Sequence, residues 1–256
     1  MAIDQRTHIM NEVELWQSAN QEQAEETIDV YIDMKSPHAY LAIRPSLMLA
    51  KDYQVHVNFL PYTVSYIETG VTTEINDKRE RQPLNDAADR KARMFYAAAR
   101  EYALLQDLPF RSPHRLLDSE LAHRALLFAK QQKLEIPFML NVYTSGWGSG
   151  WQDFELESID HLRNALTDCG ANLEDFGEYL SDAGEGAKEL TNCMHKAEAS
   201  GIVGVPHYVL ADQAEYKGLS LFGREHLSLI RYRLSERNLA RHLSVKPDFS
   251  HAWSKP

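Results

Sequence analysis

Two kinds of hydrophobic pattern alternate along the chain, and the first is typical of strands. Residues 28–32 and 55–61 have apolar side chains at every second position, as expected for short strands with a buried face. Between them, Ser36 is a suitable helix N-cap, Pro37 suits the first helical position, and an apolar run from Ala39 continues the helix. The pattern predicts a strand–helix–strand unit.

Helical spacing replaces the strand pattern in the middle of the chain. A polar stretch over 68–83, interpreted as a solvated loop or lid, comes first. Six segments then have apolar residues at helical spacing, namely 86–105, 118–133, 136–145, 158–169, 173–183 and 185–200. The third is predicted to stop at the glycine-rich stretch that begins at Gly146. Trp147 and Trp151 are interpreted as core residues of this helical block rather than as a binding platform.

Strand patterns return after Gly201. Residues 206–210 and 216–222 are separated by a hairpin-length turn, and Gly223 begins a last helix to about Arg237. The order of elements predicts an α/β fold with an all-helical insertion between its β-α-β and β-β-α halves. The expected divisions are an N-terminal helix or frayed arm over 1–26, a discontinuous sheet domain over 27–64 and 201–240, a helical insertion over 65–200, and a tail over 241–256.

Composition and charge narrow the function classes. A formal net charge of -10 argues against general nucleic-acid binding and against binding to anionic membranes. Cys169 and Cys193 form neither a CxxC motif nor a metal-ligand pattern, so no metal site and no disulfide framework are expected. The chain has no apolar signal segment at its start and no run of 18 apolar residues. We therefore expect a cytoplasmic protein.

The corner at Ser36 is the main candidate for chemistry. A helix that begins there directs free main-chain N–H groups and the positive end of its dipole toward whatever the serine hydroxyl binds. Such a site suits an anion, and a thiolate is one. The alternative interpretation is an ordinary helix cap.

The sequence Ser36-Pro37-His38-Ala39 resembles the Cys-Pro-His-Cys corner of DsbA-type disulfide oxidoreductases. Both cysteines are replaced, and dithiol exchange needs an attacking and a resolving thiol, so redox chemistry at this corner is not expected. Serine at the first position is typical of kappa-class glutathione transferases and 2-hydroxychromene-2-carboxylate isomerases. The resemblance implies a thioredoxin-like fold in which the Ser36 hydroxyl stabilises the thiolate of bound glutathione.

Two later stretches resemble the same families. Residues 201–209 contain Val205-Pro206, and the resemblance implies a cis-proline whose preceding residue, Val205, pairs with the glutathione main chain; the alternative is a plain loop. Residues 221–227 resemble a Phe-Gly-Ser-Asp-Arg stretch that holds the γ-glutamyl end. Glu225 would accept from its ammonium group, whereas Arg224 replaces the family serine and could bind the glutamyl carboxylate.

Three further residues are assigned to the substrate pocket. Lys91 lies in a stretch that resembles the segment supplying a lysine there, although a solvated helix lysine is the alternative. His38 and His207 are placed at the same corner, where each could tune a thiolate, act as a general acid, or only line the site. The asparagine that follows a Thr-Gly pair in the family is absent, because Val71 stands there.

The resemblance implies a glutathione-dependent isomerase of the 2-hydroxychromene-2-carboxylate type, acting on an aromatic-degradation intermediate by reversible thiolate addition. A kappa-like glutathione transferase and a non-catalytic thioredoxin-like binding protein are the alternatives. The expected partners are glutathione, a small aromatic or unsaturated substrate and a second copy of the chain. Leu15 and Trp16 offer apolar surface for that homodimer.

Overall fold

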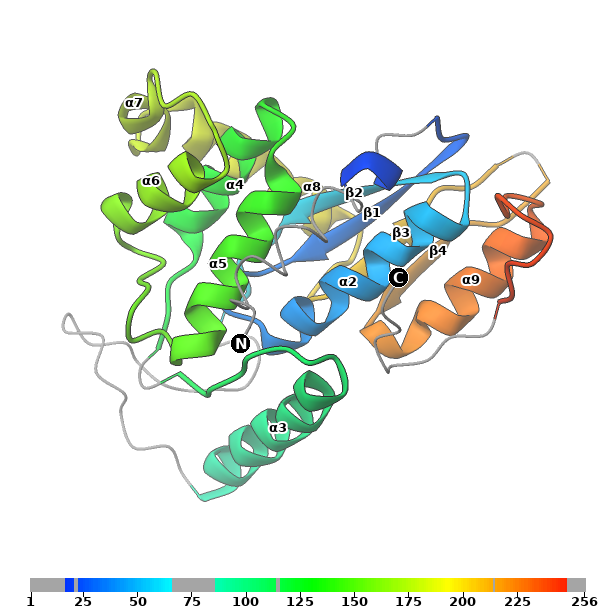
Figure 1. Ribbon diagram of the computed structural model, residues 1–256, viewed down its shortest axis with the longest axis horizontal. Helices are drawn as coiled ribbons and strands as arrows, with labels where there is room; N and C mark the ends of the chain where they lie inside the picture. The colour runs from blue at the N-terminus through cyan, green and yellow to red at the C-terminus, as the bar shows by residue number, and fades with distance from the viewer. Residues whose placement is uncertain (1–16, 21–22, 66–85, 114–115, 214, 248–256) are drawn as a thin grey trace, which may run out of the picture.

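A four-stranded mixed sheet lies at the centre of the computed structural model, which describes residues 17–20, 23–65, 86–113, 116–213 and 215–247 (Figure 1). The strand order is β2-β1-β3-β4. β1 (Glu26–Ile32) is parallel to β2 (Val55–Pro61) and antiparallel to β3 (His207–Leu210), which pairs antiparallel with β4 (Leu219–Phe222). This is the predicted α/β arrangement with its two halves in one sheet.

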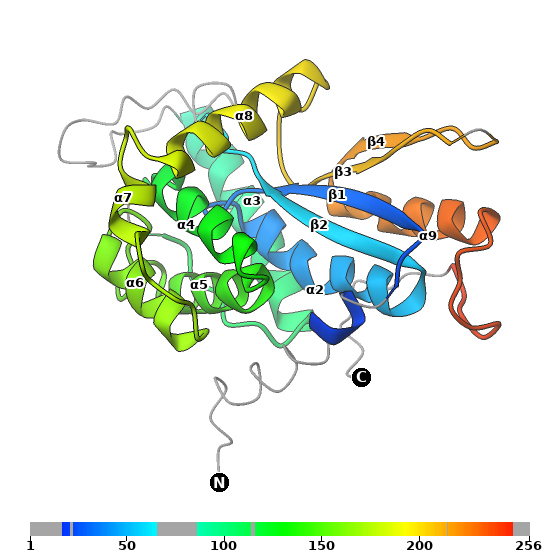
Figure 2. The ribbon, with the colours of Figure 1, turned by 90° about the horizontal axis from the view of Figure 1, so that it is seen from above.

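Helices cover both faces of the sheet. Figure 2 shows α2 (Pro37–Asp52) and α9 (Leu227–Glu236) on one face and α8 (Glu185–Ala199) on the other. The remaining helices also lie between β2 and β3 in the chain, and they are α3 (Asp86–Leu105), α4 (Glu120–Gln131), α5 (Glu135–Ser149), α6 (Ile159–Asp168) and α7 (Phe176–Leu180). In Figure 1, α4 to α7 are gathered at one end of the sheet, while α3 lies apart from them and contacts α2.

The helix α5 is longer than its sequence predicts. It continues to Ser149, through the glycine-rich stretch that was expected to end it, and stops where Gly150 adopts a left-handed φ of 66°. At Gly146 the ring of Trp151 occupies the space where a Cβ would stand, so the helix needs glycine at this position. Trp147 and Trp151 are fully buried, which confirms their interpretation as core residues.

Three other boundaries differ from prediction. β4 begins at Leu219 rather than at 216, because the N–H of Gly218 is bound by the Asp212 carboxylate in the preceding turn. α7 is much shorter than the predicted 173–183, since Asp175 has a positive φ and Ser181 is extended. The last helix is preceded by a 3-10 turn, η1 (Arg224–His226).

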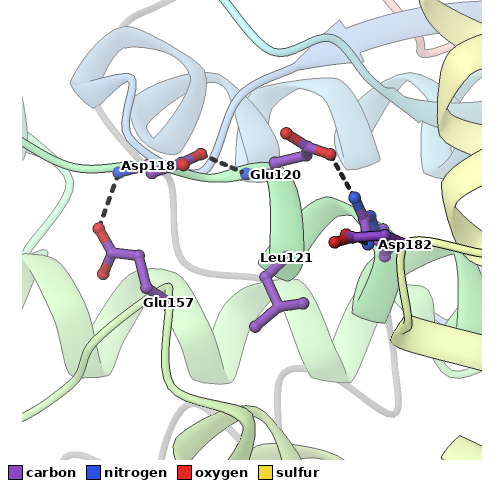
Figure 3. A pocket seen from close by; sticks show the side chains of 6 residues that line it. Asp118, Glu120, Leu121, Glu157 and Asp182 are labelled. Atoms are coloured by element: carbon purple, nitrogen blue, oxygen red, sulfur yellow. Dashed lines mark hydrogen bonds and ion pairs between the residues drawn. The ribbon is translucent and has the colours of Figure 1, made fainter. Parts of the chain in front are cut away.

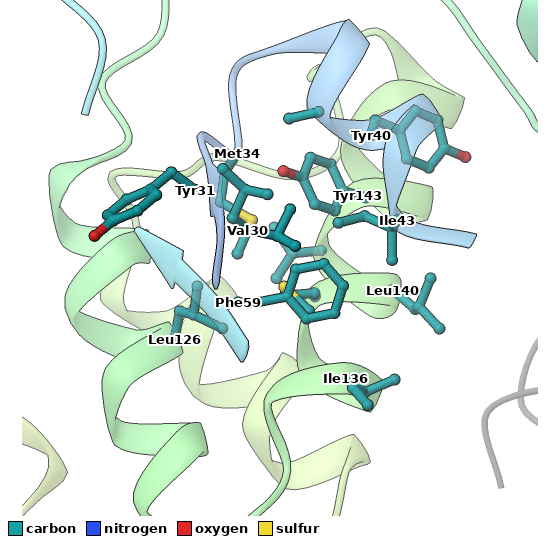
Figure 4. Packing of buried hydrophobic residues seen from close by; sticks show 14 of the residues in the cluster. Val30, Tyr31, Met34, Tyr40, Ile43, Phe59, Leu126, Ile136, Leu140 and Tyr143 are labelled. Atoms are coloured by element: carbon teal, nitrogen blue, oxygen red, sulfur yellow. The ribbon is translucent and has the colours of Figure 1, made fainter. Parts of the chain in front are cut away.

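The core is built from the sheet and the helices on either side of it. Figure 4 shows part of it, with side chains from β1, β2, α2, α4 and α5 that include Val30, Phe59, Ile43, Leu126 and Leu140, each at most 4% exposed. No helix in the described ranges has both the length and the apolar content that a bilayer span requires. Residues 17–20 are helical, whereas most of the predicted N-terminal helix and the 68–83 loop lie outside the described residues.

Candidate functional site

Ser36 is the N-cap of α2, as its sequence predicts. Its Oγ accepts a hydrogen bond from the N–H of Ala39 at 3.2 Å, and Pro37 occupies the first turn. The serine is half-buried rather than enclosed. Because the cap uses only an acceptor lone pair, the hydroxyl proton remains available to donate to an anion at the helix N-terminus.

The peptide bond between Val205 and Pro206 is cis, as the resemblance implied. β3 pairs with β1 so that His207 lies opposite Tyr31, and the chain before His207 therefore runs beside the end of β1 that leads to Ser36. Among the described residues, neither the main-chain N–H nor the C=O of Val205 has a hydrogen-bond partner. This pair of groups can bind an extended peptide as a strand edge does.

The turn η1 is directly attached to the cis-proline. The N–H of Gly223 donates to the carbonyl of Pro206 at 2.9 Å. Glu225 is exposed, and its carboxylate lies over the α-carbon of Gly223, where any Cβ would collide with it. Arg224, by contrast, is buried, and its guanidinium stands 3.6 Å from the centroid of the Tyr102 ring. Glu225 thus faces solvent at the site, while Arg224 joins η1 to α3.

His38 connects the start of α2 to both neighbouring elements. Its ring meets the ring of Phe95 on α3 edge to face, with centroids 4.2 Å apart. Burial and, to a smaller extent, the positive charge of Arg224 lower the pKa of His38 to about 4, with the negative charge of Glu225 acting in the opposite direction. The imidazole beside Ser36 is therefore neutral at pH 7.

We expect the His38 imidazole to titrate near pH 4 in the folded protein. The unfolded chain takes up this proton near pH 6.5, so His38 stabilises the fold less as the pH falls from 6.5 to 4, and its contribution is complete above 6.5. NMR titration of the imidazole C–H signals measures the pKa, and His38→Gln should flatten the stability–pH curve in this window. A midpoint near 6.5 would contradict the buried, cation-adjacent placement.

His207 does not join His38 at the corner, contrary to the sequence-based expectation. Its neighbour Tyr208 points toward α2 and lies 3.1 Å from the hydroxyl of Ser46. Side chains alternate along a strand, so His207 points to the opposite face of the sheet, where its Nε2 is 2.8 Å from Ser220 Oγ. A motif can predict that a residue lies in a strand, but the pairing of that strand decides toward which face of the sheet its side chain points.

Lys91 is exposed on α3, four residues before Phe95. This spacing puts Lys91 on the same side of the helix as the ring that contacts His38, one turn away. The structure thus brings Ser36, His38, Glu225 and the Phe95 side of α3 to one corner. The departure at Val71 lies outside the described residues.

A group of residues behind Ser36 has no counterpart in the sequence-based site. Asp33 and Lys35 form an ion pair at 2.9 Å in which both side chains are buried, and Ser119 and His123 of the α4 region contact the same carboxylate. The only local signal for this group in the sequence was the pair Asp33 and Lys35, which stand on either side of one buried residue just before the helix cap. The two α4-region partners are more than eighty residues away in the chain.

A separate pocket of about 210 Å³ lies beside Ser119 (Figure 3). It is lined by Asp118, Glu120, Leu121, Arg124, Glu157 and Asp182. Its one guanidinium is already paired with Asp182 at 2.9 Å and with Glu120. The excess of carboxylates repels anionic ligands, and no cluster suited to a metal ion occurs among the described residues. We therefore do not assign the chemistry to this pocket.

Comparison with known proteins agrees with this fold. A family model described as DSBA-like thioredoxin domain matches residues 27–235. A solved 2-hydroxychromene-2-carboxylate isomerase superposes with a TM-score of 0.63 at 19% identity, covering 83% of this chain and 97% of its own. A comparison with curated protein sequences finds no match.

Two further solved structures are also similar to this chain. A probable DsbA oxidoreductase from Streptomyces coelicolor has a TM-score of 0.60 at 15% identity, covering 87% of this chain and 93% of its own. The cytosolic disulfide reductase DsbM from Pseudomonas aeruginosa, solved with GSH, has a TM-score of 0.56 at 14% identity, covering 83% and 97%. At these identities the similarity concerns the fold.

Proposed function

The chain belongs to the DSBA-like thioredoxin domain family, and we propose that it uses this fold to bind glutathione rather than to exchange disulfides. The observation that carries the proposal is the free main-chain pair of Val205 beside a cis-proline, next to the end of β1 that leads to the Ser36 cap. The main-chain groups of Val205 suit a peptide, and the Ser36 cap suits the thiolate of that peptide.

The residues of the corner fit the parts of glutathione separately. The Ser36 hydroxyl and the N-terminus of α2 would stabilise a thiolate, Val205 would pair with the cysteinyl main chain, and Glu225 would accept from the γ-glutamyl ammonium. Arg224 is already stacked on Tyr102, so we assign it to holding η1 against α3, from which its charge still favours a nearby carboxylate. Glutathione itself would supply a nucleophilic thiol.

The organic substrate is proposed to be a small aromatic or unsaturated acid. Beyond His38, the ring of Phe95 meets the ring of Tyr96 with centroids 5.8 Å apart, which gives the corner an aromatic side. Phe95 is 44% exposed and so offers a surface on which a flat ring can stack. Lys91, one turn away on α3, would attract a substrate carboxylate.

We propose an isomerase of the 2-hydroxychromene-2-carboxylate type as the activity. The fold similarity of this chain to a solved enzyme of that name supports the proposal. The neutral His38 also supports it, since a neutral imidazole can both take and return a proton during reversible thiolate addition. A kappa-like transferase is the second candidate and would turn over aryl halides without isomerising a substrate. A non-catalytic binding protein would bind glutathione but catalyse neither reaction.

Glutathione titration by calorimetry tests the proposal. We expect wild-type binding, and a loss of about tenfold in affinity for Glu225→Gln, because a hydrogen bond to a charged group is removed. Glu198→Gln, on the exposed side of α8, is the matched control and should bind like wild type. Absence of wild-type binding at millimolar glutathione would refute the proposal, and insulin reduction above background would point to redox chemistry instead.

We also propose a homodimer in a cytosolic setting, where glutathione is reduced. Leu15 and Trp16, on which the dimer prediction partly rests, lie outside the described residues. The outer side of α3 adds apolar surface, with Met94 71%, Leu104 70% and Leu105 55% exposed. Light scattering at micromolar concentration should give a dimer that Leu104→Glu converts to a monomer; a wild-type monomer would contradict the proposal.

A further inference from the structure

The buried carboxylate of Asp33 has all of its acceptor positions occupied. Oδ1 accepts from the main-chain N–H of Lys35 at 3.0 Å and from the hydroxyl of Ser119 at 2.6 Å. Oδ2 accepts from the N–H of Val64 at 2.8 Å and from the Lys35 ammonium at 2.9 Å. Asp33 is completely buried, and the Lys35 side chain is 7% exposed. A carboxylate with four donors is fixed in both position and rotation.

His123 adds a second set of contacts to the same turn. Its Nε2 accepts from the N–H of Met34 at 3.2 Å, and its Nδ1 lies 2.7 Å from the Thr63 hydroxyl. Nε2 also lies 3.4 Å from Asp33 Oδ1, so the ring contacts both the main chain and the carboxylate of this turn. The ring therefore joins the turn after β1 to the chain after β2, and it too is fully buried.

Together these groups fix every main-chain N–H in the turn that leads to the site serine. Met34 donates to His123, Lys35 donates to the Asp33 carboxylate, and Ser36 donates to the carbonyl of Asp33 at 2.9 Å. The same carbonyl accepts from the Tyr143 hydroxyl at 3.0 Å. The direction in which the Ser36 side chain leaves the turn is thus set by residues behind it.

Stability alone is a weak explanation for this cluster. A buried ion pair gains little net free energy, because the cost of desolvating two charges offsets most of their attraction. Apolar side chains of similar volume are often as stable, but they cannot hold the main-chain N–H groups of Met34 and Lys35 in fixed directions. The cluster lies at the one turn of the fold whose geometry decides where the candidate hydroxyl points.

We infer that Asp33, supported by Lys35 and Ser119, is a positioning residue that aligns the Ser36 side chain with the N-terminus of α2. This inference rests on the proposed role of Ser36. It adds that the alignment exists before any ligand binds and is lost when the carboxylate is replaced by an amide. Asparagine at position 33 offers one oxygen where four donors require two, so at least two of the bonds would be lost.

A thiol placed at position 36 tests the inference without glutathione. In Ser36→Cys, the thiol pKa, measured from thiolate absorbance, should be lowered by the helix N-terminus. Adding Asp33→Asn should raise that pKa by about one unit, because the sulfur loses its alignment with the helix. A purely through-space effect has the opposite sign, since removing a nearby negative charge would lower the pKa.

Two further variants keep the test decisive. Ser119→Ala removes one bond to Asp33 without changing any charge, and it should raise the same thiol pKa by a smaller amount even if Asp33→Asn fails to fold. Asp52→Asn is the matched control, because Asp52 forms its ion pair with Arg231, at 2.7 Å, at the other end of α2. It should leave the thiol pKa unchanged. A fall or no change with Ser119→Ala would overturn the inference.

The glutathione form of the experiment separates the two proposals. If wild type binds glutathione, Asp33→Asn should raise the pKa of the bound thiol in a Ser36 background and have no further effect once Ser36→Ala is present. Equal effects in both backgrounds would show that Asp33 does not act through Ser36. If wild type does not bind glutathione, the proposed function fails, while the thiol comparison still decides the positioning role.

Discussion

Ser36→Ala is expected to raise the pKa of the bound glutathione thiol by about one to two units and to reduce turnover accordingly. A hydrogen bond to a charged group contributes about 1.5–3 kcal/mol, and about 1.4 kcal/mol corresponds to one pKa unit. Activity should fall without vanishing, because the N-terminus of α2 still favours the thiolate. Binding should weaken less than turnover, since Val205 and Glu225 would still hold the peptide.

Thiolate absorbance near the ultraviolet edge, titrated with pH, measures this effect. Ser158→Ala is the matched control, because Ser158 caps α6 in the same way, accepting from the N–H of His161 at 3.3 Å. Both substitutions should cost about 1 kcal/mol of stability as lost caps, but only Ser36→Ala should move the thiol pKa. Ser36→Cys should also form a mixed disulfide with oxidised glutathione. Identical titration curves for wild type and Ser36→Ala would reduce Ser36 to a helix cap.

Arg237→Met should destabilise the protein by about 3–5 kcal/mol, because it breaks a buried ion pair. The Arg237 guanidinium forms a buried ion pair with Glu26 at 2.5 Å, in which the two side chains are 2% and 6% exposed. It also donates to the carbonyl of Lys217 at 3.0 Å. The substitution would leave a buried carboxylate without a partner, at the point where the first strand meets the second half of the fold.

Urea unfolding measures the loss, with Arg233→Met on the same helix as control. Arg233 pairs with Glu236 at 2.9 Å on the surface, where the side chains are 46% and 38% exposed. Such a pair contributes about 0.2–1 kcal/mol. Similar losses for both variants, or a loss below about 1 kcal/mol for Arg237→Met, would show that burial does not increase the contribution of the Arg237–Glu26 pair to the free energy of unfolding.

The parts of the fold that could be predicted are those encoded in neighbouring residues. The alternation over 55–61 predicted β2 with its bounds, and the Ser36-Pro37 pair predicted the start of α2. The cis-proline followed from a motif rather than from periodicity. The end of α5 could not be predicted locally, because glycine weakens a helix and the contact between Gly146 and the Trp151 ring is not visible in the local pattern.

The candidate site was only partly predictable for a related reason. Ser36 and Val205 belong to short motifs, and the pairing of β1 with β3 brought both to one end of the sheet. Asp33 was overlooked because its partner Ser119 is distant in the chain and no local spacing relates the two. The face on which His207 lies could not be predicted, because the pattern of a four-residue strand does not reveal which alternate positions meet α2.

The contacts behind Ser36 limit how freely this protein can be recombined. Ser119, His123 and Tyr143, which hold the turn, all belong to the segment between β2 and β3, whereas the turn itself belongs to the first strand–helix unit. Exchanging that segment for a relative's would therefore replace the support of the Ser36 corner together with α3, which carries the proposed substrate contacts. A chimaera that changes substrate preference while keeping the chemistry must carry these three side chains with it, so the two halves of the molecule are constrained to evolve as one unit.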